Sequence, residues 1–318
     1  HSLISDYFPV EKRATALSIY ALGIPIGAMV GNYVGGWGAE ELGWRVTFFL
    51  VGLPGILVAL LIFLTLREPP RGLSEKTAPV LEDEAAESAP SMKEVFGFLW
   101  AKRSFRHIGF AAGLHAFVGY GVGTWNAPFL IRTHDLPITE VGFWLALISG
   151  IGAIGTFAGG FLGDRISAAT GDRRWYLWLT GVATVLMVPF QFVAYLYDGL
   201  WAVLPSLFVI SILGGMYLGP SFAMTQGLVT LRMRATASAI LLFMLNIIGM
   251  GLGPYFVGIA SDLLAPASGI DSLRYALCLA VLANIWAAGH YFAGARTLRS
   301  DLEATEALNL NTDEQGMS

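Results

Sequence analysis

Long apolar runs separated by short polar connections make up most of the chain. Eight stretches of about 20 residues or more contain no Asp, Glu, Lys or Arg. They lie at 14–39, 46–66, 107–131, 141–163, 175–197, 199–231, 235–261 and 275–295. Runs this long exceed ordinary strands, and in hydrocarbon a helix satisfies the hydrogen bonds of its own backbone. The pattern predicts an all-α polytopic membrane protein with eight membrane-spanning helices.

The composition agrees with this prediction and narrows the function. Hydrophobic residues make up 55% of the 318 residues and charged residues only 13%, which is too little polar material to cover a water-soluble surface. The charges lie between the apolar runs, so we expect no nucleic-acid partner. The single cysteine, Cys278, cannot form an internal disulfide. No motif calls for a metal or another cofactor, and we expect neither.

The basic residues predict the orientation of the helices. Of the 19 lysines and arginines, all but Arg45, Arg132 and Arg274 fall in segments that eight spans would place on one side. The excess of basic residues marks the cytoplasmic side. We therefore expect a multi-pass protein of a cell membrane, such as a bacterial inner membrane, with both termini in the cytoplasm. The same side should hold Arg13, Arg165, Arg173, Arg174, Arg232 and Arg234.

The connection between the second and third spans has two parts. Its first part alternates Glu75, Glu82, Asp83, Glu84 and Glu87 with Ala, Ser and Pro, a composition that predicts a flexible linker. Its second part, 91–103, gathers apolar residues near one helical face among the charged residues Lys93, Glu94, Lys102 and Arg103. This indicates a short helix lying on the membrane surface, with a helical lead-in to the third span as the alternative.

A repeat links the first and seventh predicted spans. The sequence Arg-Ala-Thr-Ala opens both, at 13–16 and 234–237, and Gly-Asn-Tyr-Val-Gly at 31–35 has a counterpart in Gly-Pro-Tyr-Phe-Val-Gly at 253–258. The repeat unit is therefore six spans. Two parallel six-helix halves are the architecture of major facilitator transporters, which this repeat resembles. The resemblance implies four spans preceding this chain, with the segment before 10 as the end of a missing helix. The divisions are then 1–69 for the end of the first half, 70–103 for the linker, 104–298 for the second half and 299–318 for a cytoplasmic tail.

A motif follows the fourth span. The residues 160–165 read Gly-Phe-Leu-Gly-Asp-Arg, and 171–174 read Gly-Asp-Arg-Arg. This resembles the cytoplasmic loop signature of the major facilitator superfamily, Gly-x-Leu-x-Asp-Arg followed by Gly and a basic cluster, with a few extra residues between the two parts. An ordinary basic cytoplasmic loop is the alternative. The resemblance implies a gating set of Gly160, Asp164, Arg165, Gly171, Arg173 and Arg174, with Arg13 at the start of the first span as the partner of Asp164.

Three stretches resemble the spinster-like branch of that superfamily. They are 67–72, Arg-Glu-Pro-Pro-Arg-Gly; 125–132, Trp-Asn-Ala-Pro-Phe-Leu-Ile-Arg; and 253–262, Gly-Pro-Tyr-Phe-Val-Gly-Ile-Ala-Ser-Asp. The resemblance implies a major facilitator fold, of which eight of twelve helices are present. It also implies a secondary transporter that moves a small organic or lipid-like molecule by alternating access, with protons as a candidate driving ion. Because none of the eight spans contains an acidic or basic residue, a titratable coupling group within them must be a histidine.

The same resemblance predicts a substrate cavity. The third and sixth spans take the first and fourth places of the second half, which line the central cavity in this family. The predicted lining is His115, Tyr120, Trp125 and Asn126 on one helix and Tyr217, Ser221 and Thr225 on the other, with Asn32 and Asn246 as weaker candidates. A hydrogen bond to a neighbouring helix is the other interpretation of His115.

Other functions remain open at this point. A proton symporter of organic acids from another branch of the superfamily is the alternative transporter. A membrane receptor or scaffold without a transport cycle is a different class. A membrane enzyme is not expected, because the spans contain no Ser-His-Asp set, His-Glu-x-x-His motif or carboxylate pair. The expected partners are a small-molecule substrate and membrane lipid.

Overall fold

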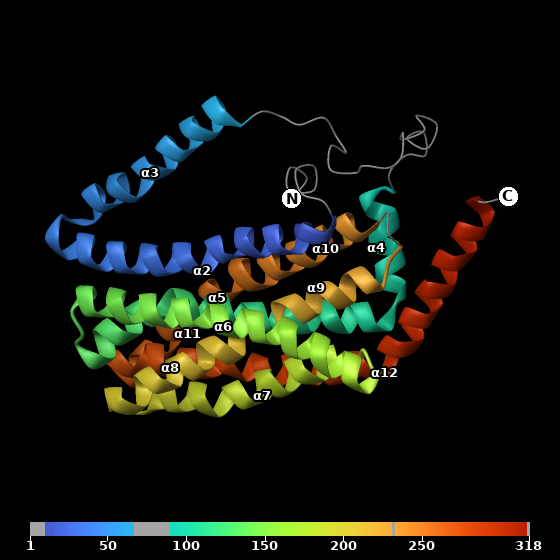
Figure 1. Ribbon diagram of the computed structural model, residues 1–318. Helices are drawn as coiled ribbons and strands as arrows, with labels where there is room; N and C mark the ends of the chain where they lie inside the picture. The colour runs from blue at the N-terminus through green and yellow to red at the C-terminus, as the bar shows by residue number, and fades with distance from the viewer. Residues whose placement is uncertain (1–9, 67–89, 231–232, 317–318) are drawn as a thin grey trace. The chain divides into compact units, whose positions relative to one another are not determined.

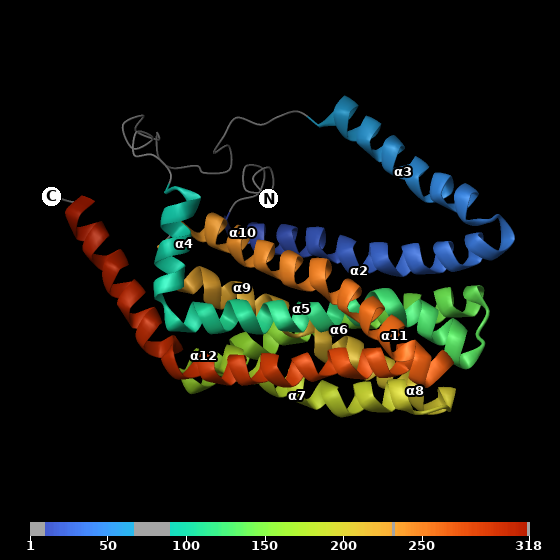
Figure 2. The ribbon, with the colours of Figure 1, turned by 180° about the vertical axis from the view of Figure 1, so that it is seen from behind.

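A computed structural model describes residues 10–66, 90–230 and 233–316, and every regular element in these ranges is a helix (Figures 1 and 2). The helices belong to two units, one of His1–Ala89 with Pro137–Gly150 and one of Pro90–Leu136 with Ile151–Ser318. Each unit is described by itself. The segment before Val10, the acidic linker, the 67–72 stretch and Arg232 lie outside the described residues.

The first unit contains α2 (Val10–Glu41), α3 (Trp44–Thr65) and the beginning of α6 (Ile138–Thr170). Gly43, with φ 77°, makes the turn between α2 and α3. Gly36 and Gly142 let α2 and α6 approach closely, because a Cβ on Gly36 would lie 2.7 Å from the Gly142 Cα. Near this contact the Asn32 side-chain amide donates to Ser149 Oγ at 3.0 Å. Small residues and one amide therefore join these two helices.

The second unit contains the rest of α6 and the helices on both sides of it in the sequence. They are α4 (Met92–Ala101), α5 (Arg103–His134), α7 (Trp175–Leu196), α8 (Leu200–Gly215), α9 (Leu218–Gly227), α10 (Arg234–Leu245), the π-helix η3 (Asn246–Leu252), α11 (Gly253–Ser268) and α12 (Ser272–Gly316), with a short 3₁₀ turn at Gly269–Asp271. Each of the predicted spans coincides with helical residues, so the all-helical prediction is confirmed.

Two predicted spans depart from a single regular α-helix. The sixth breaks at Met216 and Tyr217, between α8 and α9, after a glycine pair and before Pro220. The seventh passes through η3 just before Pro254, which has no amide hydrogen to donate to the preceding turn. Broken helices of this kind occur in membranes where neighbouring helices satisfy the freed backbone groups.

Five stretches of the described residues are both long and apolar enough to cross a membrane. They are Trp44–Thr65, Ile138–Thr170, Trp175–Leu196, Leu200–Gly227 and Arg234–Leu308, and together they contain all the predicted spans except the first and third. Those two form most of α2 and α5, which are 32 residues each and are also long enough to span. Glycines and polar residues lower the hydropathy of α5.

Glycines on α6 determine how closely α8 packs. A Cβ on Gly155 would lie 1.8 Å from the Ile212 carbonyl oxygen, and one on Gly159 would lie 2.3 Å from the Met216 carbonyl oxygen. No side chain fits at these positions without separating the helices. Van der Waals contact between backbones therefore holds this pair together, as is common in lipid, where helix association lacks a hydrophobic driving force.

One end of the second unit is closed by α4 and by the last part of α12. Val95 and Leu99 of α4 are fully buried in a core that also contains Leu302 of α12. Lys102 is extended (φ −84°, ψ 123°) and separates α4 from α5, so α4 is a helix of its own that lies across the end of α5 in both views (Figures 1 and 2). The capping box of Ser91 and Glu94 begins it. Its position on a membrane surface stays a prediction.

We predict that Gly155→Ala destabilises the protein by about 1 to 3 kcal/mol, because the new methyl group collides with the α8 backbone. Gly160→Ala on the same helix is the matched control. Its Cβ would meet open space, so alanine should be neutral or slightly stabilising. Thermal unfolding of the purified variants in one detergent measures the difference. Equal melting temperatures for the two variants would show that the close contact does not govern stability.

Candidate functional site

His115 lies buried where α5, α7 and α8 meet. Its Nε2 is 3.1 Å from the Gly214 carbonyl oxygen, to which it can only donate, and its Nδ1 is 3.2 Å from Thr184 Oγ1. If the ring is neutral, Nδ1 carries no hydrogen and must accept one from the Thr184 hydroxyl. That hydroxyl also lies 2.8 Å from the Thr180 carbonyl oxygen, and its single hydrogen cannot serve both acceptors at once. The polar contact therefore joins three helices and leaves one hydroxyl with two alternative acceptors.

Tyr217, at the break between α8 and α9, packs on the same histidine. The two rings are stacked with centroids 4.2 Å apart and an interplanar angle of 28°. Tyr120, one turn along α5 from His115, is 44% exposed. The structure thus brings His115 and Tyr217 into contact, as predicted residues from different helices, whereas Tyr120 stays exposed.

Ser221 and Thr225 of α9 are also buried inside the second unit. The hydroxyls of Ser221 and Tyr291 lie 3.2 Å apart, and Thr225 Oγ1 has no hydrogen-bond partner within the described residues. His115, Ser221 and Thr225 therefore do not form an open polar stripe in this structure, because neighbouring helices bury all three. Their part in lining a substrate cavity stays a prediction.

The remaining predicted cavity residues make contacts of different kinds. Trp125 Nε1 donates to the Pro254 carbonyl oxygen at 2.9 Å, and Asn126 Oδ1 accepts from the Tyr195 hydroxyl at 3.1 Å. Asn246 donates to the Leu242 carbonyl oxygen of its own helix at 2.9 Å. Asn32 makes the packing contact of the first unit given above. Trp125 and Asn126 are half-buried, so they retain some accessible surface.

One buried pair escaped the sequence analysis. Asn284 of α12 donates to the Gln191 side-chain oxygen of α7 at 3.0 Å, and both residues are almost completely buried. An amide side chain in an uncharged span is itself a signal of an interhelical bond. Their pairing cannot be found without knowing that α7 and α12 are neighbours.

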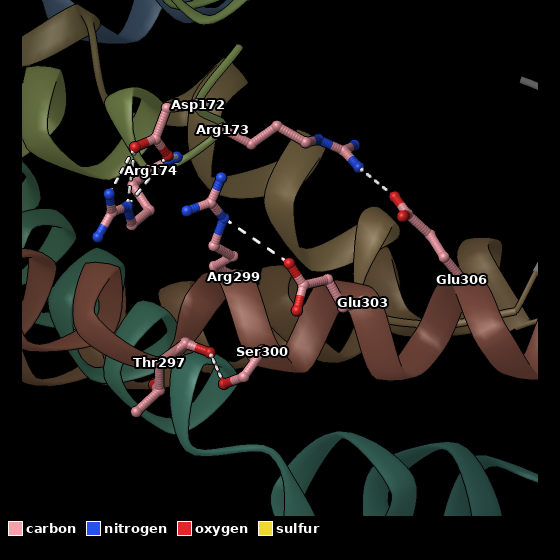
Figure 3. A network of polar contacts seen from close by, with 8 residues as sticks. All are labelled: Asp172, Arg173, Arg174, Thr297, Arg299, Ser300, Glu303 and Glu306. Carbon is pink, nitrogen blue, oxygen red and sulfur yellow. Dashed lines mark hydrogen bonds and ion pairs between the residues drawn. The ribbon is translucent and has the colours of Figure 1, made fainter. Parts of the chain in front are cut away.

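The motif loop after α6 is fixed by short-range polar contacts. Tyr176 donates a hydrogen bond to the Asp164 carboxylate, and Gly171 has φ 66°, which favours glycine. Asp172 accepts from the Arg174 guanidinium at 2.7 Å, and this hydrogen bond lowers the pKa of the Asp172 carboxyl. Arg173 reaches α12, where it pairs with Glu306 at 3.1 Å (Figure 3).

A cavity of 190 Å³ lies between this loop and α12. It is lined by Gly171, Asp172, Arg173, Arg174, Arg299, Leu302, Glu303 and Glu306. Each arginine of the lining has a carboxylate beside it, including Arg299, whose Nε is 3.7 Å from Glu303 (Figure 3). The lining therefore offers no unpaired cation to a ligand.

Comparison with known proteins decides the family. A profile described as the Major Facilitator Superfamily matches residues 1–254. The chain is 30% identical over 311 residues to an MFS-type efflux pump of Mycolicibacterium smegmatis, which covers 95% of this chain and 68% of that protein. The chain belongs to the major facilitator superfamily. Its match to a hexuronate transporter of Bacillus subtilis is 25% identical, covers 85% of this chain and spans only 63% of that relative.

The fold and the branch are supported by a solved structure. A bacterial homolog of the human lysosomal transporter Spinster, in an inward-facing and unoccupied conformation, matches with a TM-score of 0.80 at 29% identity. The match covers 94% of this chain and 74% of that chain. The major facilitator fold and the spinster-like resemblance are thereby confirmed.

The gating residues of this major facilitator chain have different surroundings. Asp164 is bound by Tyr176 of the same unit, Arg165 is exposed, and Gly160 has open space beside it. The side chain of Arg13 lies outside the described residues, although its backbone belongs to α2. The contact between Asp164 and the first predicted span therefore stays a prediction.

The last part of α12 is bonded to the beginning of α5. The Asp301 carboxylate accepts from the Ser104 amide at 3.0 Å and from its hydroxyl at 2.7 Å, which caps the N-terminus of α5. Lys102 donates to the Asp301 carbonyl oxygen at 3.1 Å and to Thr305 Oγ1 at 2.8 Å. Burial lowers the pKa of Lys102, while the charge of Asp301 opposes this shift. The expected tail boundary at 298/299 thus lies inside a helix that is fixed to the second unit.

We predict that Asp301→Ala destabilises the protein by roughly 1 to 3 kcal/mol, because two bonds from Ser104 lose a charged acceptor. Glu306→Ala removes a carboxylate of the same helix. Its ion pair with Arg173 is exposed at both partners, so the substitution should lower the stability little. Thermal unfolding at moderate salt distinguishes the two. A larger loss for Glu306→Ala than for Asp301→Ala would refute this assignment.

Proposed function

We propose that the intact protein is a secondary active transporter that moves a small organic or lipid-like molecule by alternating access. Membership of the superfamily over residues 1–254 is the observation that carries this proposal. The chain spans about two thirds of the relatives compared above, so the activity belongs to the intact protein. The break between α8 and α9 supports it, since interrupted helices are typical of transporter cores.

The side chains of the second unit favour a substrate whose contacting surface is neutral or amphipathic. Tyr120, Trp125 and Asn126 offer aromatic surface and neutral hydrogen-bonding groups. The predicted spans contain no acidic or basic side chain, so this unit has no permanent charge to pair with a substrate inside the membrane. Tyr217 and His115 extend this surface inward in the proposed cavity.

A proton symporter of organic acids is the second candidate. The 25% identity to the hexuronate transporter favours it. An acid substrate would need cationic partners, which the predicted spans could supply only through histidine. In this proposal protons are the driving ion, both termini lie in the cytoplasm, and the protein resides in a cell membrane of the bacterial inner-membrane kind.

Transport by the intact protein in proteoliposomes separates these candidates. We expect an imposed proton gradient to drive net movement of an amphipathic probe such as a lysophospholipid, with no movement of glucuronate. Uptake of glucuronate alone would establish the organic-acid symporter instead. Binding of either compound without net movement would overturn transport and favour a receptor.

We predict that Asp164→Asn reduces transport while expression stays near that of the unmodified protein. The substitution keeps the shape and removes the charge that the gating motif requires. Loss of a contact worth roughly 1 to 2 kcal/mol shifts a two-state equilibrium about tenfold. Asp135→Asn is a matched control, because it removes a loop carboxylate at a residue whose positive φ of 52° asparagine also tolerates.

Tyr176→Phe distinguishes two explanations of such a loss. It keeps the ring and removes the hydroxyl that donates to Asp164. If the carboxylate acts by closing against the first span, transport should survive Tyr176→Phe better than Asp164→Asn. Equal losses would assign Asp164 to the local loop structure, and normal transport by Asp164→Asn would remove it from the gating mechanism.

A further inference from the structure

A patch of exposed rings lies where α4, α5 and α12 meet in the second unit. Phe96 stacks on Trp100 with centroids 5.4 Å apart, and Trp100 meets Phe110 edge-on at 6.1 Å. His290 continues the series, 5.7 Å from Phe110 and 5.9 Å from Trp286. The four hydrophobic members are each more than a third exposed, up to 64% for Trp286. We call these five residues the interfacial patch.

The α4 helix has two apolar faces. Val95 and Leu99 fill the core, whereas Met92, Phe96 and Trp100 on the adjacent face are exposed. The buried face accounts for the packing of α4 in the core, and on the exposed face Trp100 meets Phe110 while more than a third of each side chain stays accessible. Aromatic residues beside basic residues at the end of a spanning helix are typical of the level of lipid headgroups.

Two arginines border the patch. Arg103, Arg106 and Phe110 are spaced three and four residues apart, so they lie along one face of α5. Neither arginine has an ion-pair partner within the described residues, and the nearby Asp301 carboxylate is occupied by Ser104. Arg173 and Arg174 of the motif loop, by contrast, each have a carboxylate partner.

The patch also bridges two helices through a histidine pair. The Nδ1 atoms of His107 and His290 lie 2.9 Å apart, so one ring donates to the other. This bond fixes the surface of α5 beside that of α12. Gly289, next to His290 on α12, has open space where a Cβ would be. Fixed rings with open space and unpaired arginines beside them can hold an acyl chain next to a charged headgroup.

We propose that the interfacial patch, with Arg103 and Arg106, is a binding site for an anionic phospholipid of the surrounding membrane. The phosphate pairs with the guanidinium groups, which match its oxygens in a forked geometry, and the first acyl carbons lie on the rings. Because the headgroup of such a lipid carries no ammonium group, its phosphate keeps a net negative charge that can pair with the two arginines. This lipid is a bound partner and is distinct from the transported substrate.

Native mass spectrometry of the intact protein tests the proposal. The protein is titrated in mixed micelles with phosphatidylglycerol, phosphatidylcholine or inorganic phosphate. We expect selective retention of phosphatidylglycerol, and a loss of about tenfold in its affinity for the Arg103→Gln/Arg106→Gln variant. Arg132→Gln, an exposed arginine at the other end of α5, is the matched control and should retain the lipid.

Two further variants keep the test decisive. Arg103→Lys/Arg106→Lys preserves the charge, so it should fold and bind with an intermediate affinity. Trp100→Leu/Trp286→Leu keeps an apolar surface and should weaken retention of both lipids. Equal retention of the two phospholipids would mean that the lipid is ordinary annular lipid. Unchanged retention by the Arg103→Gln/Arg106→Gln variant would exclude these arginines from the site. Displacement of the lipid by inorganic phosphate would indicate a site for a soluble anion. Each of these results would overturn the proposal.

Discussion

The lack of ionised side chains within the apolar runs is the constraint on which the rest of the structure depends. A bundle without internal charges has only neutral hydrogen bonds and backbone packing to select its neighbours. His115 shows the consequence, because its ring reaches a hydroxyl of α7 and a carbonyl of α8 from α5. The Asn284–Gln191 and Ser221–Tyr291 contacts apply the same solution between other helices. Close glycine contacts, such as those between α6 and α8, and clusters of buried apolar side chains add to this packing.

The end of the second unit that carries the motif loop is built differently. There Asp301 caps α5, Asp172 binds Arg174, and Arg173 pairs with Glu306. Charge-assisted bonds are strong when they are partly buried and weak when both partners are exposed. This end therefore has a firm inner part around Asp301 and an outer rim of exchangeable ion pairs. Such a division suits a surface that must stay assembled while its loop contacts change.

The sequence was sufficient to predict the spans, because uncharged runs of this length have one stable structure in lipid. It also predicted a helix within 91–103, where α4 lies, but left open whether this helix continued into the third span. It could not predict the interruption at Met216, because a glycine pair before a proline is compatible with either a bend or a break. The burial of Thr305 and Leu302 was missed for a related reason. Their surroundings are polar in sequence and become a core only when α4 and α5 lie beside them.

The candidate site was predictable in part. Helical spacing placed His115 and Asn126 on one face, but periodicity does not say which neighbour covers that face. His115 is covered by α7 and α8, whereas Tyr120 stays exposed. The fold could be inferred from composition and a repeat, whereas the hydrogen-bond partners of individual polar groups could be identified only from the packing of the helices.

The most direct test of this account is a double-mutant cycle between His115→Leu and Thr184→Val, measured by unfolding of the intact protein in detergent micelles. Both replacements are apolar and close in size, so they remove the hydrogen bond without leaving a large cavity. If neutral interhelical bonds hold the second unit together, the two losses should be coupled by about 1 kcal/mol, a typical value for such bonds in membrane bundles. Strictly additive losses, or a His115→Leu variant as stable as the unmodified protein, would contradict the account.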